Sequence, residues 1–150
     1  MDYHIPSTRK EFEHIVNGFR TKALPSKEWT HEAHLITGLW HVAELGYENA
    51  LAEMRLNIPV YNESVGGMNT DSSGYHDTIT FFWIWLLNEF WNRNEVKGQS
   101  FERVCNKFLQ SKYADRGNAF IFYTKDLLFT KEARLGVVEP DIQPLDFEMI

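Results

Sequence analysis

Histidines are the residues of this sequence whose type and spacing could support chemistry. His31 and His34 stand three positions apart in a segment of helical periodicity, 29 to 46, so both side chains fall on one helical face, one turn apart. His76 opens a second, strongly apolar segment after a polar loop. Imidazole is a common metal ligand, and three imidazoles with an open position are typical of a catalytic metal site. We therefore predict that His31, His34 and His76 hold a divalent metal ion, zinc or iron.

Oxygen donors adjoin these histidines in the sequence. Glu32 follows His31, while Tyr75 and Asp77 flank His76. Asp77 or Glu32 could serve as a general base or accept a hydrogen bond from a metal-bound group, and Tyr75 is a further catalytic candidate. A carboxylate could also replace one histidine, because two histidines and one carboxylate form a typical site for non-haem iron.

The histidines allow two interpretations of function. In the first, the protein is a metal-dependent enzyme, a hydrolase or a non-haem-iron-type enzyme, and the ion activates water or polarises a small-molecule substrate. In the second, the protein is a non-catalytic helical protein that binds a small molecule or an interaction partner. Its histidines are then structural and bond carboxylates or backbone carbonyls, as buried imidazoles require. The polar residues around His76 favour the first interpretation.

Further residues on the two histidine-bearing segments bear on the site. His41 lies on the same face as the histidine pair but two turns further along, so we assign it to packing or to support of a ligand. Gly38 on that face would leave room for a ligand or a facing aromatic ring. Thr80 and Trp83 share a face below His76 and are predicted to form the floor of a small cavity.

The histidines are positioned by two predicted helices. Thr30 is a suitable N-cap and Gly46 a suitable C′ residue for the first of them. The second, residues 75 to 91, is apolar almost all round in its middle portion, yet its apolar run is far shorter than the roughly 20 residues that cross a bilayer. We expect it to be the central buried helix. Gly74 permits a sharp turn before it, which places His76 in its first turn.

The remaining segments complete a helical bundle. They are predicted as a helix after an N-cap at Ser7, a helix from 47 to 58 with a kink or early end at Pro59, a helix from 101 to 109 after an N-cap at Ser100, and helix or helical turns over 113–128. The tail after Gly136 should lie extended against the bundle through Val137, Ile142 and Leu145. The predicted fold is all-α, a compact bundle of four to six helices with an extended C-terminal tail in one domain, residues 1–150.

Composition restricts the partners of the chain. A formal charge of −6 and a pI near 5.5 argue against nucleic acid or an anionic membrane, so we expect a small-molecule ligand or substrate, and a homodimer is compatible with the sequence. The single cysteine, Cys105, is expected to be a buried, inert thiol and excludes an internal disulfide. The first residues contain no apolar signal-peptide core, so we expect a cytoplasmic protein.

Three motifs resemble those of a family of small uncharacterised bacterial proteins. The motifs are Trp29-Thr30-His31-x-Ala33-His34-Leu35, Asn69-Thr70-Asp71-x-Ser73-Gly74-Tyr75-His76-x-Thr78-Ile79-Thr80 and Glu139-Pro140-Asp141. The resemblance implies a bacterial protein without implying an activity. In outline, the chain is also similar to the DinB/YfiT-like metal-binding four-helix bundles. That family pairs its histidines as His-x-x-x-His on a late helix, whereas here a His-x-x-His pair comes first, so the ligand assignment rests on this sequence.

Overall fold

The computed structural model describes residues 4–150, which form helices and contain no β-strand. The α-helices are α1 (Arg9–Arg20), α2 (His31–Leu45), α3 (Tyr47–Ser64), α4 (Asp77–Trp91), α5 (Phe101–Leu109), α6 (Lys125–Leu128) and α7 (Lys131–Leu135). Short 3-10 helices are η1 (Ser26–Glu28), η2 (Lys112–Ala114), η3 (Arg116–Ile121) and η4 (Phe147–Met149). The prediction of an all-α bundle is confirmed.

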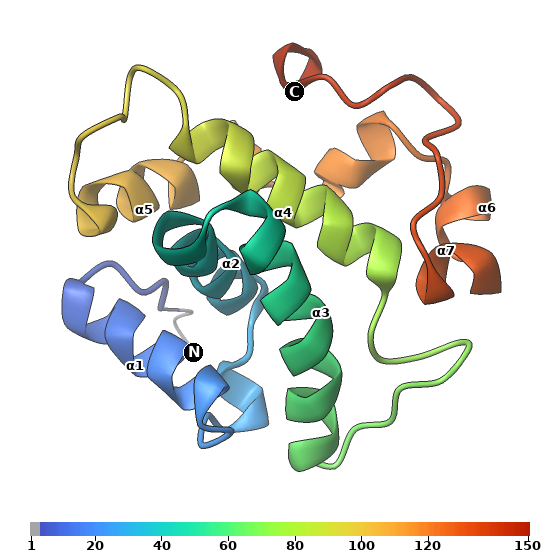
Figure 1. Cartoon of the computed structure of the whole chain (residues 1–150), viewed down its shortest axis with the longest axis horizontal. Helices are drawn as coiled ribbons and strands as arrows, with labels where there is room; N and C mark the ends of the chain where they lie inside the picture. The colour runs from blue at the N-terminus through green and yellow to red at the C-terminus, as the bar shows by residue number, and fades with distance from the viewer. Residues whose placement is uncertain (1–3) are drawn as a thin grey trace.

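Helix α4 is the centre of the bundle. It packs against α2, α3 and α7, and α2 in turn packs against α1, α3 and α5. Figure 1 shows α4 crossing the middle of the molecule, with α1, α2 and α3 on one side and α6 and α7 on the other. This position explains its composition, because a helix covered by neighbours on most sides must be apolar on most sides.

Helix α2 begins and ends where its sequence signals predict. The Thr30 hydroxyl accepts a hydrogen bond from the backbone N–H of Ala33, at 3.2 Å, as an N-cap does. Gly46 ends the helix at a φ of 80°, in the left-handed region that favours glycine, and α3 starts at the next residue. The two histidines of the first turn are therefore held at a well-defined helix end.

Two other helix ends differ from the predictions. Thr8, rather than Ser7, caps α1: its hydroxyl accepts from the Glu11 N–H, and the Glu11 carboxylate accepts from the Thr8 N–H. This reciprocal pair satisfies two donors at once, which a cap at Ser7 would not do. Helix α3 continues past Pro59 to Ser64, so the predicted early end at Pro59 is wrong. The alternative, a kink at Pro59, stays a prediction.

Helix α5 has the predicted cap and the predicted buried thiol. The Ser100 hydroxyl accepts a hydrogen bond from the backbone N–H of Arg103 at 3.2 Å. Cys105 is buried, and this burial raises the pKa of its thiol far above the ordinary value. The thiol is therefore unreactive at neutral pH.

The glycine on the histidine-bearing face of α2 marks a close approach of two helices. A Cβ added to Gly38 would lie 2.7 Å from Leu87 Cδ1 and 3.3 Å from Ile84 Cδ1, both on α4. The space predicted for a ligand or an aromatic ring is thus filled by aliphatic side chains. Gly38 serves to bring α2 and α4 together, which closes one end of the site described below.

The C-terminal segment contains a helix that its sequence did not predict. Residues 131 to 135 form α7, whose N-cap is the hydroxyl of Thr130. The tail that follows enters no sheet, but Val137 and Ile142 are 41% and 50% exposed, so they do not anchor it as predicted. Leu145 packs against the core as predicted, and Phe147 of η4 is buried.

Candidate functional site

The first turn of α2 holds His34 in one orientation. Its Nδ1 lies 2.6 Å from the carbonyl oxygen of Thr30, which is the residue that caps the helix. Because a carbonyl only accepts hydrogen bonds, Nδ1 carries the proton and Nε2 has an unshared electron pair. The indole of Trp29 covers the ring, with centroids 3.9 Å apart. His34 therefore offers a fixed hydrogen-bond acceptor.

His31 is held in the same way by a different carbonyl. Its Nε2 donates to the backbone oxygen of Ala114 in η2, at 2.8 Å, so in the neutral ring Nδ1 has the unshared pair. The ring meets Trp83 of α4 edge to face, with centroids 5.3 Å apart. In their neutral forms, the two imidazoles one turn apart thus each have one unprotonated nitrogen.

Both histidines line a half-open cavity of about 410 Å³ between α2, α3 and α4, which we call the α2–α4 cavity. Its apolar lining consists of Trp29, Leu35, Met54, Ile58, Ile79, Trp83, Ile84 and Leu87, and its polar lining of Thr30, His31, His34, Thr80 and Arg116. Thr80 and Trp83 thus line a cavity, as predicted, together with the α2 histidines, and Thr80 also lines a second cavity with His76. An apolar volume of this size with a few convergent polar groups is typical of a small-molecule site.

A second cavity, of about 630 Å³, adjoins the first on the side of the loop from 65 to 76, and we call it the loop cavity. The two share the lining residues Trp29, His34, Ile58, Ile79 and Thr80. His34 therefore stands in the wall between the α2–α4 cavity and the loop.

The surroundings of His34 keep it neutral. Burial lowers the pKa of its imidazole from 6.5 to about 4, because the protonated ring loses its hydration. The hydrogen bond to the Thr30 carbonyl opposes this shift, whereas the charge of His31 in its protonated form and the positive charge of Arg116 add to it. At neutral pH, His34 therefore accepts hydrogen bonds and carries no charge.

His76 has a structural role instead of the predicted place in a metal site. It precedes the first turn of α4 as the N-cap, where its Nδ1 accepts from the Ile79 N–H at 3.1 Å. Its Nε2 donates to the carbonyl of Leu128 in α6, at 2.7 Å. Both ring nitrogens are thus engaged, and neither is available to a metal ion in this arrangement. Gly74 makes the predicted sharp turn before it, with a φ of 81°.

The structure does not bring the three predicted metal ligands together. Within residues 4–150, no group of three His, Cys, Asp or Glu side chains is arranged to hold a metal ion. His31 and His34 share the α2–α4 cavity, whereas His76 lines the second cavity with His34. The predicted divalent metal ion, zinc or iron, stays a prediction.

The predicted catalytic oxygen donors also lie outside the α2–α4 cavity. The Asp77 carboxylate accepts from Arg55 Nε at 3.0 Å and from the Tyr75 hydroxyl at 2.6 Å. This cluster joins α3, the loop and α4, and Tyr75 lines the loop cavity. Glu32 is half-buried in the first turn of α2 but is not a lining residue of the α2–α4 cavity.

Sequence reasoning missed two polar groups of the site. The indole Nε1 of Trp29 is buried and has no hydrogen-bond partner among residues 4–150. Arg116, from η3, reaches the α2–α4 cavity, and its side chain forms no ion pair within the described part of the chain. Only the tertiary fold brings Arg116 beside α2, so no local signal could have identified it.

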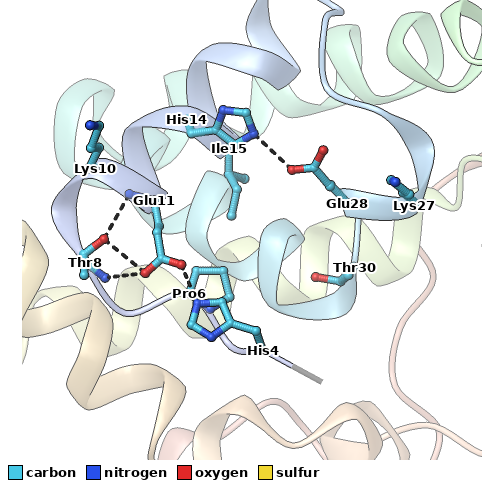
Figure 2. A pocket seen from close by; sticks show the side chains of 10 residues that line it. All are labelled: His4, Pro6, Thr8, Lys10, Glu11, His14, Ile15, Lys27, Glu28 and Thr30. Carbon is cyan, nitrogen blue, oxygen red and sulfur yellow. Dashed lines mark hydrogen bonds and ion pairs between the residues drawn. The ribbon is translucent and has the colours of Figure 1, made fainter. Parts of the chain in front are cut away.

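A shallower hollow of about 540 Å³ lies on the other side of Thr30 (Figure 2). There the His4 ring bonds the Glu11 carboxylate, and the His14 ring lies 3.0 Å from Glu28. The bond from His4 is the main cause that lowers the pKa of Glu11 to about 2. Both histidines are exposed and paired with carboxylates, unlike His31 and His34 of the α2–α4 cavity, which are bonded to backbone carbonyls.

Comparisons with protein-family models, with curated proteins and with solved structures found no match. None of the helices in the described residues is long and apolar enough to cross a membrane.

Proposed function

We propose that this protein binds a small molecule with an apolar body in the α2–α4 cavity, with His34 as the acceptor for its polar end. The observation that carries the proposal is the pair of backbone-held histidines. Each has one nitrogen bonded to a carbonyl and one left unprotonated, beside a largely apolar volume. An acceptor that is already oriented costs little to use when a ligand arrives.

The low pKa of His34 favours a role in binding over a role in proton abstraction. A general base works best when its pKa lies near the pH at which it acts. With a pKa of about 4, His34 is a weak base at neutral pH but a competent hydrogen-bond acceptor. This corresponds to the second of the two interpretations given by the sequence, extended by a defined cavity.

A binding experiment with a cavity-filling variant tests the proposal. Trp29 and Trp83 line the cavity, so their fluorescence should change saturably on addition of 1-octanol, whose hydroxyl can donate to His34. Ile79→Trp should fill the cavity and abolish the response. Ile142→Trp, at a half-exposed position of the tail, is the matched control and should retain it. Equal binding by Ile79→Trp and the wild type would refute the proposal.

A metal-dependent enzyme is the second candidate. Histidine ligands of metal ions characteristically donate their other ring N–H to a carbonyl or carboxylate, as His31 and His34 do here. A zinc or iron ion on these two nitrogens would keep open positions for water and substrate. The nearby positive charge of Arg116 opposes a cation there, which is why we place this candidate second. Elemental analysis of tag-free protein, with His34→Ala as the comparison, tests it.

A further inference from the structure

The two cavities that meet at His34 contain almost no charged side chains. Among the residues of the described chain that line the loop cavity, none is an Asp, Glu, Lys or Arg. The α2–α4 cavity has one, Arg116, which is an exposed residue. An ammonium group would find no carboxylate here, and an ionised carboxylate has no hydrogen to donate to the acceptor nitrogen of His34. The lining therefore favours a ligand whose polar head is uncharged.

Thr80 provides a second acceptor where the two cavities adjoin. Like His34, it lines both of them. Its hydroxyl donates to the carbonyl oxygen of His76 at 2.9 Å, so its one hydrogen is used and its oxygen can only accept a further hydrogen bond. Nε2 of neutral His34 is an acceptor as well, because Nδ1 carries the proton. A ligand that bonds both groups must supply two donors.

The two cavities differ in the polarity of their walls. The α2–α4 cavity is lined mainly by aliphatic and aromatic side chains. The loop cavity adds uncharged polar side chains, those of Ser26, Asn62, Ser73 and Tyr75. Hydroxyl and amide groups can both donate and accept, so they suit the hydroxyl groups of a ligand. An apolar chain thus fits on one side of His34, and a hydroxylated head fits on the other.

Resting on the proposed binding function, we propose that the ligand is an uncharged amphiphile with two hydroxyl groups close together at one end, as in an alkane-1,2-diol. One hydroxyl donates to His34 Nε2 and the other to Thr80 Oγ1. The hydrocarbon chain fills the space between α2, α3 and α4, and the head faces the polar wall of the loop cavity. The two acceptors shared by both cavities thus select the head, and the apolar lining selects the chain.

Two isomeric diols test this inference by calorimetry at pH 7, with 1-octanol as the reference. Octane-1,2-diol should bind roughly three- to tenfold more tightly than 1-octanol, which is the effect of one more neutral hydrogen bond. Octane-1,8-diol has the same atoms, but its second hydroxyl would lie against the apolar lining without a partner. It should therefore bind more weakly than 1-octanol.

A variant of Thr80 tests the second acceptor. Thr80→Val keeps the shape of the side chain and removes its oxygen, so octane-1,2-diol should bind no more tightly than 1-octanol, whose own affinity should not change. Thr37→Val is the matched control, because the buried Thr37 hydroxyl has no hydrogen-bond partner in the described residues and lines neither cavity. It should change neither affinity. Circular dichroism checks that both variants fold, and the comparison of the two diols needs no variant.

The outcomes separate the ligand class from the proposed function. Equal affinities for the two diols, or equal losses in Thr80→Val and Thr37→Val, would overturn the diol head, while binding of 1-octanol that Ile79→Trp abolishes would leave the proposed function in place. Tighter binding of octanoate or octylamine than of octane-1,2-diol would overturn the uncharged head. Binding of none of these probes would overturn both proposals.

Discussion

Nδ1 of His34 donates to the carbonyl of Thr30 at 2.6 Å, while the Thr30 hydroxyl caps the helix that carries His34. One residue thus caps the start of the helix and sets the tautomer of the histidine. The unprotonated Nε2 follows from this bond, and so does the acceptor character of the site. A change at Thr30 would therefore affect the helix and the site together.

The low pKa of His34 predicts that acid weakens the fold. The folded value, about 4, lies below the ordinary 6.5, so the unfolded chain binds a proton that the folded protein does not. The contribution of His34 is complete above about pH 6.5 and is lost as the pH falls toward 4, by roughly 1–3 kcal/mol. Denaturant unfolding at pH 7 and pH 4.5 measures it.

Two variants isolate this contribution. His34→Gln should lose less free energy of unfolding between pH 7 and pH 4.5 than the wild type does. His14→Gln, at an exposed histidine, is the control and should behave as the wild type. The assignment fails if His34→Gln and the wild type lose the same amount.

Replacement of His76 should destabilise the protein. His76→Ala removes the cap of α4 and the bond to the Leu128 carbonyl, and we expect a loss of about 1–3 kcal/mol in the free energy of unfolding. His76→Asn keeps a side chain suited to capping but cannot reach Leu128 in the same way, so it should lose less. Unchanged stability in His76→Ala would contradict the structural role, and thermal or denaturant unfolding provides the measurement.

The sequence predicted those features that depend on neighbouring residues. Thr30 and Gly46 mark the ends of α2 because capping and a positive φ are local requirements, and Ser100 marks α5 for the same reason. The central helix followed from its apolar composition. The pairing of His31 and His34 followed from the helical period.

Features that depend on distant partners were not predictable. His76 was assigned to metal because its partner, the carbonyl of Leu128, lies 52 positions away. Arg116 reaches the site from η3, and the face of Gly38 meets α4 rather than a ligand. A residue type with several roles, such as histidine, is assigned correctly only when its bonding partners are known.

Gly38→Ala tests the close contact of α2 with α4. The added Cβ would lie 2.7 Å from Leu87 Cδ1, so a side chain or a helix must shift, at a cost of about 1–3 kcal/mol. Gly136→Ala is the control, because a Cβ there meets nothing within 4 Å. Equal melting temperatures for the wild type and Gly38→Ala would show that the contact is not as tight as described.

Tyr75→Phe separates the Asp77 cluster from the binding site. The variant loses the 2.6 Å hydrogen bond to the Asp77 carboxylate, and we expect a destabilisation of about 0.5–1.5 kcal/mol. The affinity for 1-octanol should stay unchanged, because the Tyr75 side chain lines the loop cavity but not the α2–α4 cavity. A large loss of affinity without loss of stability would return Tyr75 to the set of residues that act on the ligand.

Nuclear magnetic resonance of the ¹⁵N-labelled protein during addition of 1-octanol tests the central claim most directly. The five tryptophans provide an internal comparison, since each has one indole N–H. We expect the Trp29 indole signal and the His34 Nε2 signal to move saturably together, while the indole signal of Trp40, which lies outside the α2–α4 cavity, stays in place. Unmoved Trp29 and His34 signals, or equal shifts at all five tryptophans, would contradict binding of a small apolar molecule in the α2–α4 cavity.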